Sequence, residues 1–99
     1  MIKDGKVAVL ISPDYGAGWY TWNTEYPDCL FDPMLASLVL EGKMDEAVTY
    51  ATLRWPEAYL GGLDTLTVKW VPQGTAFRVH EYDGSETLEI KEDLDWFVA

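Results

Sequence analysis

The dipeptide Asp83-Gly84 constrains the fold of this chain more than any other feature. It lies between two stretches in which apolar and polar residues alternate, Ala76 to Tyr82 and Glu86 to Lys91. Asp-Gly in this setting is the strongest short signal for a β-hairpin, because a type I′ turn needs a positive φ at both central residues. The sequence therefore predicts two antiparallel strands joined by a two-residue turn.

The turn also fixes the register of the two strands, and the side chains agree with that register. Counting outward from the turn puts apolar residues opposite each other on one side and a cation opposite an anion on the other. A shift of one residue would destroy this agreement. The predicted pairs are Tyr82 with Ser85, His80 with Thr87, Val79 with Leu88, Arg78 with Glu89 and Phe77 with Ile90.

Two further strands and two helices precede the hairpin. The apolar, β-branched run Lys6 to Ser12 predicts a strand that is buried on both faces or central in a sheet. Asp32-Pro33 predicts a helix start, with Asp as N-cap and Pro as the first helical residue, and Gly42 predicts its end. An apolar stripe from Met44 to Trp55 predicts a second helix. Alternation from Thr65 to Val71 predicts another strand.

This order of elements predicts an α+β fold. It consists of a strand, a helical hairpin and a three-stranded antiparallel meander, with the helices on one face of a mainly antiparallel sheet. The 99 residues fit a single domain, residues 1–99. An apolar tail is expected to pack on the core or to add a short strand, since it would otherwise be adhesive. Its apolar residues are Leu94, Trp96, Phe97 and Val98.

The net charge disfavours several classes of partner. Seventeen Asp and Glu against seven Lys and Arg give a net charge of −10. Direct binding to nucleic acid or to an anionic membrane depends on cationic neutralisation, so we expect neither partner. The acidity serves solubility in the simplest interpretation, and in the alternative one it meets a basic protein surface.

The sequence offers little support for catalysis. A single cysteine, Cys29, cannot form an intramolecular disulfide, which favours a cytoplasmic location. Burial is the common state of such a thiol, although its place before a helix start could lower its pKa. One histidine, His80, with scattered carboxylates makes a poor metal or catalytic set. We therefore expect no cofactor, no metal and no catalytic residue, and a binding protein fits better than an enzyme.

The segment Tyr15 to Tyr26 is the first candidate binding surface. Five of its twelve residues are aromatic, and Gly16 and Gly18 open the backbone. Exposed rings mark binding sites, and Trp and Tyr dominate interface hot spots, but the same rings can fill a small core. We expect a division, with some rings pointing inward and others outward.

The glycine-rich part of this loop also permits a nucleotide-binding interpretation. Backbone N–H groups of Gly16 to Gly18 could hold phosphate while the rings of Trp19 and Trp22 stack on a base. The full Gly-x-Gly-x-x-Gly pattern is absent because position 21 is Thr, and Asp14 would repel phosphate. In the simpler interpretation, the small residues let the loop fold tightly.

The hairpin end is the second candidate surface. Seven of the seventeen acidic residues lie between Glu81 and Asp95. They form either a solvated face of the hairpin or an acidic patch that is presented to a basic groove of another protein. Asp83 and Glu86, at the turn, are the residues placed best for such a contact.

Several motifs, spread along nearly the whole chain, resemble those of a known protein family. The motifs are Gly16-Ala17-Gly18-Trp19 with Thr21-Trp22-Asn23, Gly61-Gly62, Trp70-Val71-Pro72 with Gly74 and Phe77-Arg78, and Glu81-Tyr82-Asp83-Gly84-Ser85-Glu86. In this combination the chain resembles a family of small acidic proteins of tailed bacteriophages. The resemblance implies no catalytic residues. It implies a protein made in the cytoplasm of an infected bacterium, where small acidic phage proteins often bind a host or defence component.

Two hypotheses of different classes follow. In the first, the chain is a binding protein that inhibits or sequesters a host or defence protein through the aromatic loop and the acidic hairpin. In the alternative, it sequesters or transforms a nucleotide with the loop Gly16 to Trp22. A virion component and a homodimer are also consistent with the sequence, because edge strands and surplus rings invite pairing. The candidate binding residues are Tyr15, Gly16, Gly18, Trp19, Trp22, Asn23, Asp83 and Glu86.

Overall fold

The computed structural model describes residues 1–91, and these residues form a small α+β fold, as the sequence predicts. The strands are β1 (Ile2–Lys3), β2 (Lys6–Ile11), β3 (Thr67–Pro72), β4 (Phe77–Tyr82) and β5 (Ser85–Ile90), and the helices are α1 (Pro33–Leu40) and α2 (Met44–Arg54). Short 3₁₀ helices lie in the connections, at Tyr20–Trp22, Pro27–Leu30 and Leu63–Thr65. Every strand pair is antiparallel, with the order β1-β2-β3 in one sheet and β4-β5 in a second.

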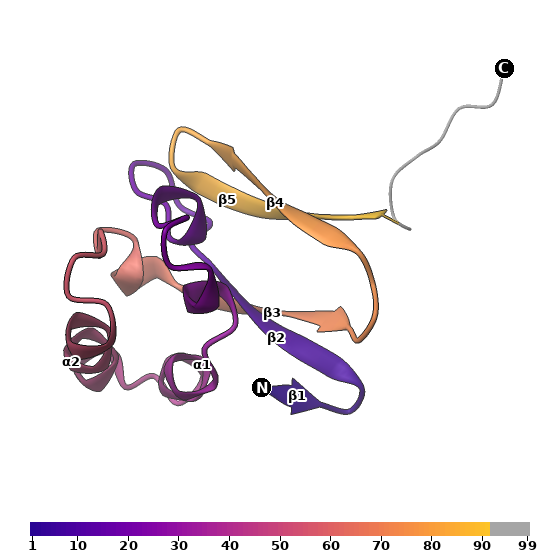
Figure 1. The fold of residues 1–99 in the computed structure, drawn as a ribbon, viewed down its shortest axis with the longest axis horizontal. Helices are drawn as coiled ribbons and strands as arrows, with labels where there is room; N and C mark the ends of the chain where they lie inside the picture. The colour runs from indigo at the N-terminus through magenta and orange to yellow at the C-terminus, as the bar shows by residue number, and fades with distance from the viewer. Residues whose placement is uncertain (92–99) are drawn as a thin grey trace, which may run out of the picture.

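Strand β2 lies at the centre of the core. It is the middle strand of its sheet, and its side chains alternate between two apolar clusters. Ala8 and Leu10 pack with residues of α1 and α2, whereas Val9 and Ile11 pack towards the β4–β5 hairpin. Figure 1 shows the helices on one side of this sheet and the hairpin on the other. Because both faces are covered, the strand is apolar from Val7 to Ile11, and the predicted burial on both faces is confirmed.

The register predicted for the second hairpin is confirmed. All the predicted pairs occur, from Tyr82 with Ser85 at the turn to Phe77 with Ile90 at the open end. The turn residues have the positive φ values that a type I′ turn needs, 52° at Asp83 and 86° at Gly84.

A first hairpin, β1–β2, was not among the predicted elements. Its turn is Asp4-Gly5, with φ values of 53° and 75°, so it uses the same dipeptide in the same conformation. Strand β1 has two residues, Ile2 and Lys3. Two residues are too few to show the alternation on which recognition of a strand depends.

The helical hairpin begins and ends as the sequence predicts. The carboxylate of Asp32 accepts a 2.9 Å hydrogen bond from the backbone N–H of Leu35, and Pro33 is the first residue of α1. Gly42, with φ of 71°, follows its last turn. The hydroxyl of Tyr50 on α2 donates to the second oxygen of Asp32 at 2.9 Å, which ties the two helices together.

The apolar tail from Glu92 to Ala99, with its predicted packing, lies outside the described residues. Among residues 1–91, no helix is both long enough and apolar enough to cross a membrane.

Candidate functional site

A buried carboxylate closes the loop that follows β2. Glu86 has an exposed fraction of 0%. One of its oxygens accepts a hydrogen bond from the backbone N–H of Ser12 at 2.8 Å, and the other accepts from the N–H and the hydroxyl of Thr21 at 2.8 and 2.7 Å. The backbones also meet, because Glu86 N–H donates to the Ser12 carbonyl and Gly16 N–H donates to that of Asp83. The hairpin therefore fixes the loop at its start and in its middle, and Figure 1 shows the two side by side.

Glycines allow the loop to pass close to two other backbone segments. A Cβ atom on Gly84 would lie 2.5 Å from the backbone nitrogen of Ala17, and one on Gly62 would lie 2.5 Å from the carbonyl oxygen of Gly18. Backbone atoms cannot move aside as a flexible side chain can, so no larger residue fits at either position. The loop thus runs between the hairpin turn and the connector that follows α2.

The rings of the loop divide between core and surface, as expected. Trp19 is fully buried, its indole N–H donates to the Cys29 carbonyl at 2.9 Å, and its ring packs edge-on against Trp55. Trp22, three residues later, keeps 41% of its surface exposed, and Tyr15 keeps 73%. Only the outward group can contact a partner directly.

Asn23 ties the loop to the connector. Its side-chain amide donates to the carbonyls of Trp19 and Tyr59, each at 2.8 Å, and its side-chain oxygen accepts from the N–H of Tyr59 at 2.7 Å. The residue is buried, and these contacts satisfy its amide. Asn23 therefore positions the loop and does not face a partner.

Two exposed pairs of rings result, one towards the hairpin and one towards the connector. Tyr15 meets Tyr82 edge-to-face with 6.4 Å between ring centroids, and Trp22 meets Tyr59 at 5.1 Å. Each pair joins a ring of the loop to a ring from another segment. We call these four residues the aromatic edge.

Sequence reasoning missed two members of this edge, Tyr59 and Tyr82. A signal existed for Tyr82, because strand alternation puts it on the same face as Arg78 and His80, both exposed. No comparable signal existed for Tyr59, which lies in an irregular connector.

The eight predicted binding residues separate into two groups. Those at the surface are Tyr15, Gly16, Trp22 and Asp83, and those inside are Gly18, Trp19, Asn23 and Glu86. Glu86 requires a correction, because the expected acidic surface patch included it. Its register puts it on the same face of β5 as Leu88 and Ile90, so it points into the molecule.

The three segments that supply the aromatic edge carry charges of one sign. The loop, residues 12–27, the connector, residues 56–66, and the hairpin tip, residues 81–87, contain carboxylates and no lysine or arginine. Asp14 precedes Tyr15 in the sequence, Glu81 and Asp83 flank Tyr82, and all three acidic residues are exposed. Cations lie elsewhere, for example Lys3 and Lys6 at the first hairpin. The edge therefore carries a negative field.

Three backbone amides of the loop are already engaged in hydrogen bonds. Ser12 and Thr21 bind Glu86, and Gly16 binds the Asp83 carbonyl. A phosphate on the Ser12 or Thr21 amide would have to displace a buried carboxylate of like charge, which counts against binding at these two amides. Among residues 1–91, no three His, Cys, Asp or Glu side chains are grouped so that they could hold a metal ion.

The thiol of Cys29 is inert by position. Burial, reinforced by the charges of Asp28, Glu86 and Asp32, raises its pKa to about 12. The suggestion that the nearby helix start lowers this pKa is therefore wrong. A thiol that stays protonated at neutral pH is a poor nucleophile.

Comparisons of the chain with protein-family models, with curated proteins and with solved structures found no match. The assignment of a function therefore depends on the surface described above.

Proposed function

We propose that this chain is a non-catalytic binding protein. Its aromatic edge docks on a basic surface of another protein and so inhibits or sequesters that protein. The observation that supports this function best is the pair of exposed ring contacts between segments whose charged side chains are all carboxylates. Tyr and Trp are the commonest anchors of interfaces, and their faces attract the cations of Arg and Lys.

The rigidity of the loop supports the same proposal. Glu86 holds the loop through Ser12 and Thr21, and Asn23 holds it to Tyr59. A partner that binds preformed rings does not have to order them first, which removes one cost of association. Carboxylates around the rings would steer a basic partner and speed its encounter.

We propose that this activity takes place in an infected bacterium. The resemblance to small acidic proteins of tailed bacteriophages suggests an infected bacterium, with a host or defence protein as the target in its cytoplasm. A binding protein of this kind needs no cofactor.

A capture experiment with matched variants tests the proposal. Wild-type protein, the double variant Tyr15→Ala/Tyr82→Ala and the control Leu53→Ala are immobilised and exposed to bacterial lysate at about 50 and about 300 mM salt. Leu53 is suited as a control because it is 77% exposed on α2, away from the edge. We expect wild type and control to retain the same protein, and the double variant to lose at least about 90% of it.

Two outcomes would contradict the proposal. One is equal retention by the double variant, and the other is the absence of any stoichiometric protein at low salt. The nucleotide alternative is tested in parallel by titrating the protein with ATP, GTP and cyclic dinucleotides while tryptophan fluorescence is followed. Quenching that disappears in Trp22→Phe would favour the alternative, because a base stacked on this exposed ring quenches its emission.

A further inference from the structure

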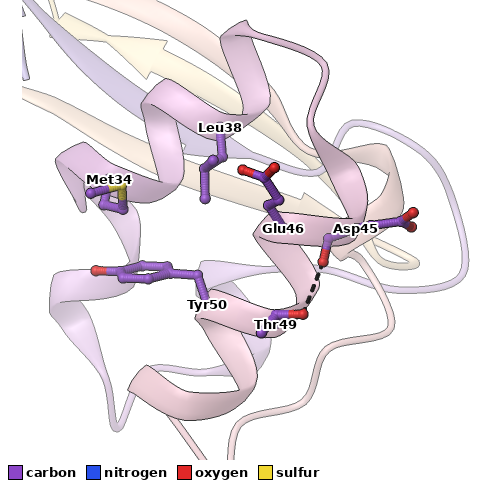
Figure 2. Close-up of a pocket in the computed structure, with 6 residues that line it drawn as sticks. All are labelled: Met34, Leu38, Asp45, Glu46, Thr49 and Tyr50. Carbon is purple, nitrogen blue, oxygen red and sulfur yellow. Dashed lines mark hydrogen bonds between the residues drawn. The ribbon is translucent and has the colours of Figure 1, made fainter.

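The outer side of the helical hairpin carries an open groove that is separate from the aromatic edge. Figure 2 shows its lining, which comes from both helices. Met34 and Leu38 belong to α1, and Asp45, Glu46, Thr49 and Tyr50 belong to α2. None of these residues belongs to the loop, the connector or the second hairpin, so the groove can bind a partner independently of the edge.

The groove changes character along its length. In Figure 2, Met34 lies beside the ring of Tyr50 at one end, and Leu38 lies beside Glu46 at the other, while the carboxylate of Asp45 points away from Leu38. Met34 and Leu38 are one helical turn apart, which is about 6 Å along the axis. One end is therefore apolar and the other acidic, one turn away.

The apolar end is preformed and uncovered. The ring of Tyr50 packs edge-on against Trp55 with 6.1 Å between centroids, and its hydroxyl donates to Asp32. Met34 keeps 53% of its surface exposed and is not part of either core cluster. A partner would thus meet a fixed ring and a flexible thioether, a combination that adapts to apolar side chains.

The acidic end has two carboxylates that are unpaired in the described part of the chain. Within the described chain, the side chains of Asp45 and Glu46 are exposed and take part in no hydrogen bond or ion pair. Lys43, a neighbour in sequence, is bound to Glu41 at 3.0 Å. Acids in a first helical turn are favoured by the helix dipole alone. Their place beside an uncovered apolar end is what points to a partner.

We propose that this groove binds an amphipathic helix of a partner protein that carries an apolar side chain and, one turn away, a lysine or arginine. The apolar side chain covers Met34 and Tyr50, and the cation meets Asp45 and Glu46. Residues i and i+4 of a helix are separated by about 6 Å, which matches the step between the two ends of the groove. A second copy of this chain fits less well, because two chains of charge −10 repel each other.

The test uses a designed peptide and variants of equal net charge. The probe is a fluorescein-labelled, tryptophan-free helical peptide of alanine with leucine and lysine at i and i+4 spacing, and binding is followed by anisotropy. We expect Met34→Ser to weaken binding about tenfold. The control Ile2→Ser, which replaces an apolar side chain that is 59% exposed on β1, should change it less than about twofold.

The acidic end is tested by Asp45→Asn/Glu46→Gln against the control Glu57→Gln/Asp64→Asn, which removes two charges elsewhere. We expect the affinity for the peptide to fall about threefold to tenfold in Asp45→Asn/Glu46→Gln and to stay unchanged in the control. The difference should become smaller at about 500 mM salt. Circular dichroism checks that each variant is folded. If Met34→Ser is unfolded, the comparison of Asp45→Asn/Glu46→Gln with its control tests the proposal alone. Equal losses in variant and control, or amide shifts in ¹⁵N spectra that map to the aromatic edge, would overturn the proposal. So would a wild-type dimer that Met34→Ser dissociates, because the occupant would then be a second copy.

Discussion

The carboxylate of Glu86 accepts a 2.7 Å hydrogen bond from the hydroxyl of Thr21, although 65 residues separate them in the chain. Two backbone amides bind the same carboxylate, so one side chain satisfies donors from two places in the loop, Ser12 and Thr21. Burying a charge is costly unless donors surround it, and hydrogen bonds to a charged acceptor are the stronger kind. Glu86 is therefore the residue on which the shape of the aromatic edge depends.

Substitution of Glu86 is expected to lower the free energy of unfolding, and the loss should grow with the number of acceptor oxygens that are removed. Glu86→Ala leaves the donors of Ser12 and Thr21 buried without partners and should lower the free energy of unfolding by about 3 kcal/mol or more. Glu86→Gln keeps one oxygen but turns an amide towards the Thr21 N–H, so about 1–2 kcal/mol is expected. Urea unfolding measures both.

The matched control is Glu89→Gln, three residues further along β5. Glu89 pairs with the exposed Arg78, so its loss should change the free energy of unfolding by about 0.5 kcal/mol. If Glu86→Gln costs no more than Glu89→Gln, the internal carboxylate does not hold the loop.

A pair of glycines separates backbone strain from close contact. Gly74 and Gly84 have nearly equal φ values, 85° and 86°. Alanine at either position adopts a left-handed conformation, which costs about 1 kcal/mol. A Cβ on Gly74 meets nothing within 4 Å, whereas one on Gly84 meets the backbone of Ala17 at 2.5 Å.

Gly84→Ala should therefore cost about 2 kcal/mol more than Gly74→Ala in thermal or urea unfolding. It should also speed hydrogen exchange at the Gly16 amide, which donates to the Asp83 carbonyl. Equal effects of the two substitutions would show that the hairpin tip does not press against the loop.

Asn23→Ala should loosen the connection between the loop and the connector. The substitution removes the acceptor of the Tyr59 N–H and the donors to two carbonyls, so a loss of about 2 kcal/mol in the free energy of unfolding is expected. Thr24→Ala, at the exposed neighbouring position, should stay within about 0.5 kcal/mol of wild type. An Asn23→Ala protein as stable as the Thr24→Ala protein would contradict this role.

Ionisation of Cys29 should weaken the fold at alkaline pH. Its folded pKa, about 12, lies above the ordinary value of 9.0. Between these values the unfolded chain loses the proton and the folded chain keeps it, so the contribution is intact below pH 9 and falls as pH rises. The slope is about 1.4 kcal/mol per pH unit.

The comparison with Cys29→Ala isolates this effect from other titrating groups. Between pH 9 and pH 10, wild type should lose about 1 kcal/mol more stability than the variant, since the slope begins gradually at the unfolded pKa. Iodoacetamide should label the thiol only after unfolding. An equal pH dependence in both proteins would mean that the folded thiol ionises freely.

Features that depend on one or two residues were predictable from the sequence. Asp83-Gly84, Asp32-Pro33 and Gly42 each determine a local backbone conformation, and the elements they delimit occur where expected. The continuous apolar run of β2 predicted cover on both faces for the same kind of reason, because each exposed position would have cost free energy.

The site was harder to predict, because it depends on contacts between distant segments. Trp19 and Trp22 look alike in sequence, and the burial of Trp19 depends on Trp55 and on the Cys29 carbonyl. Glu86 illustrates a conflict of signals, since its charge indicates the surface and its register indicates the interior. Glu86 is buried as its register indicates, because the loop presents hydrogen-bond donors to that face of the strand.

The long reach of Glu86 has a consequence for biosynthesis. Ser12 and Thr21 precede it by 74 and 65 residues, so ribosomes working at about 5–20 residues per second make these donors some 3–15 s before their acceptor. Throughout that interval the backbone N–H groups of Ser12 and Thr21 lack the acceptor that they have in the folded protein. The ring of Tyr15 meets Tyr82 only after the second hairpin has emerged, so a nascent chain presents no finished edge to its surroundings.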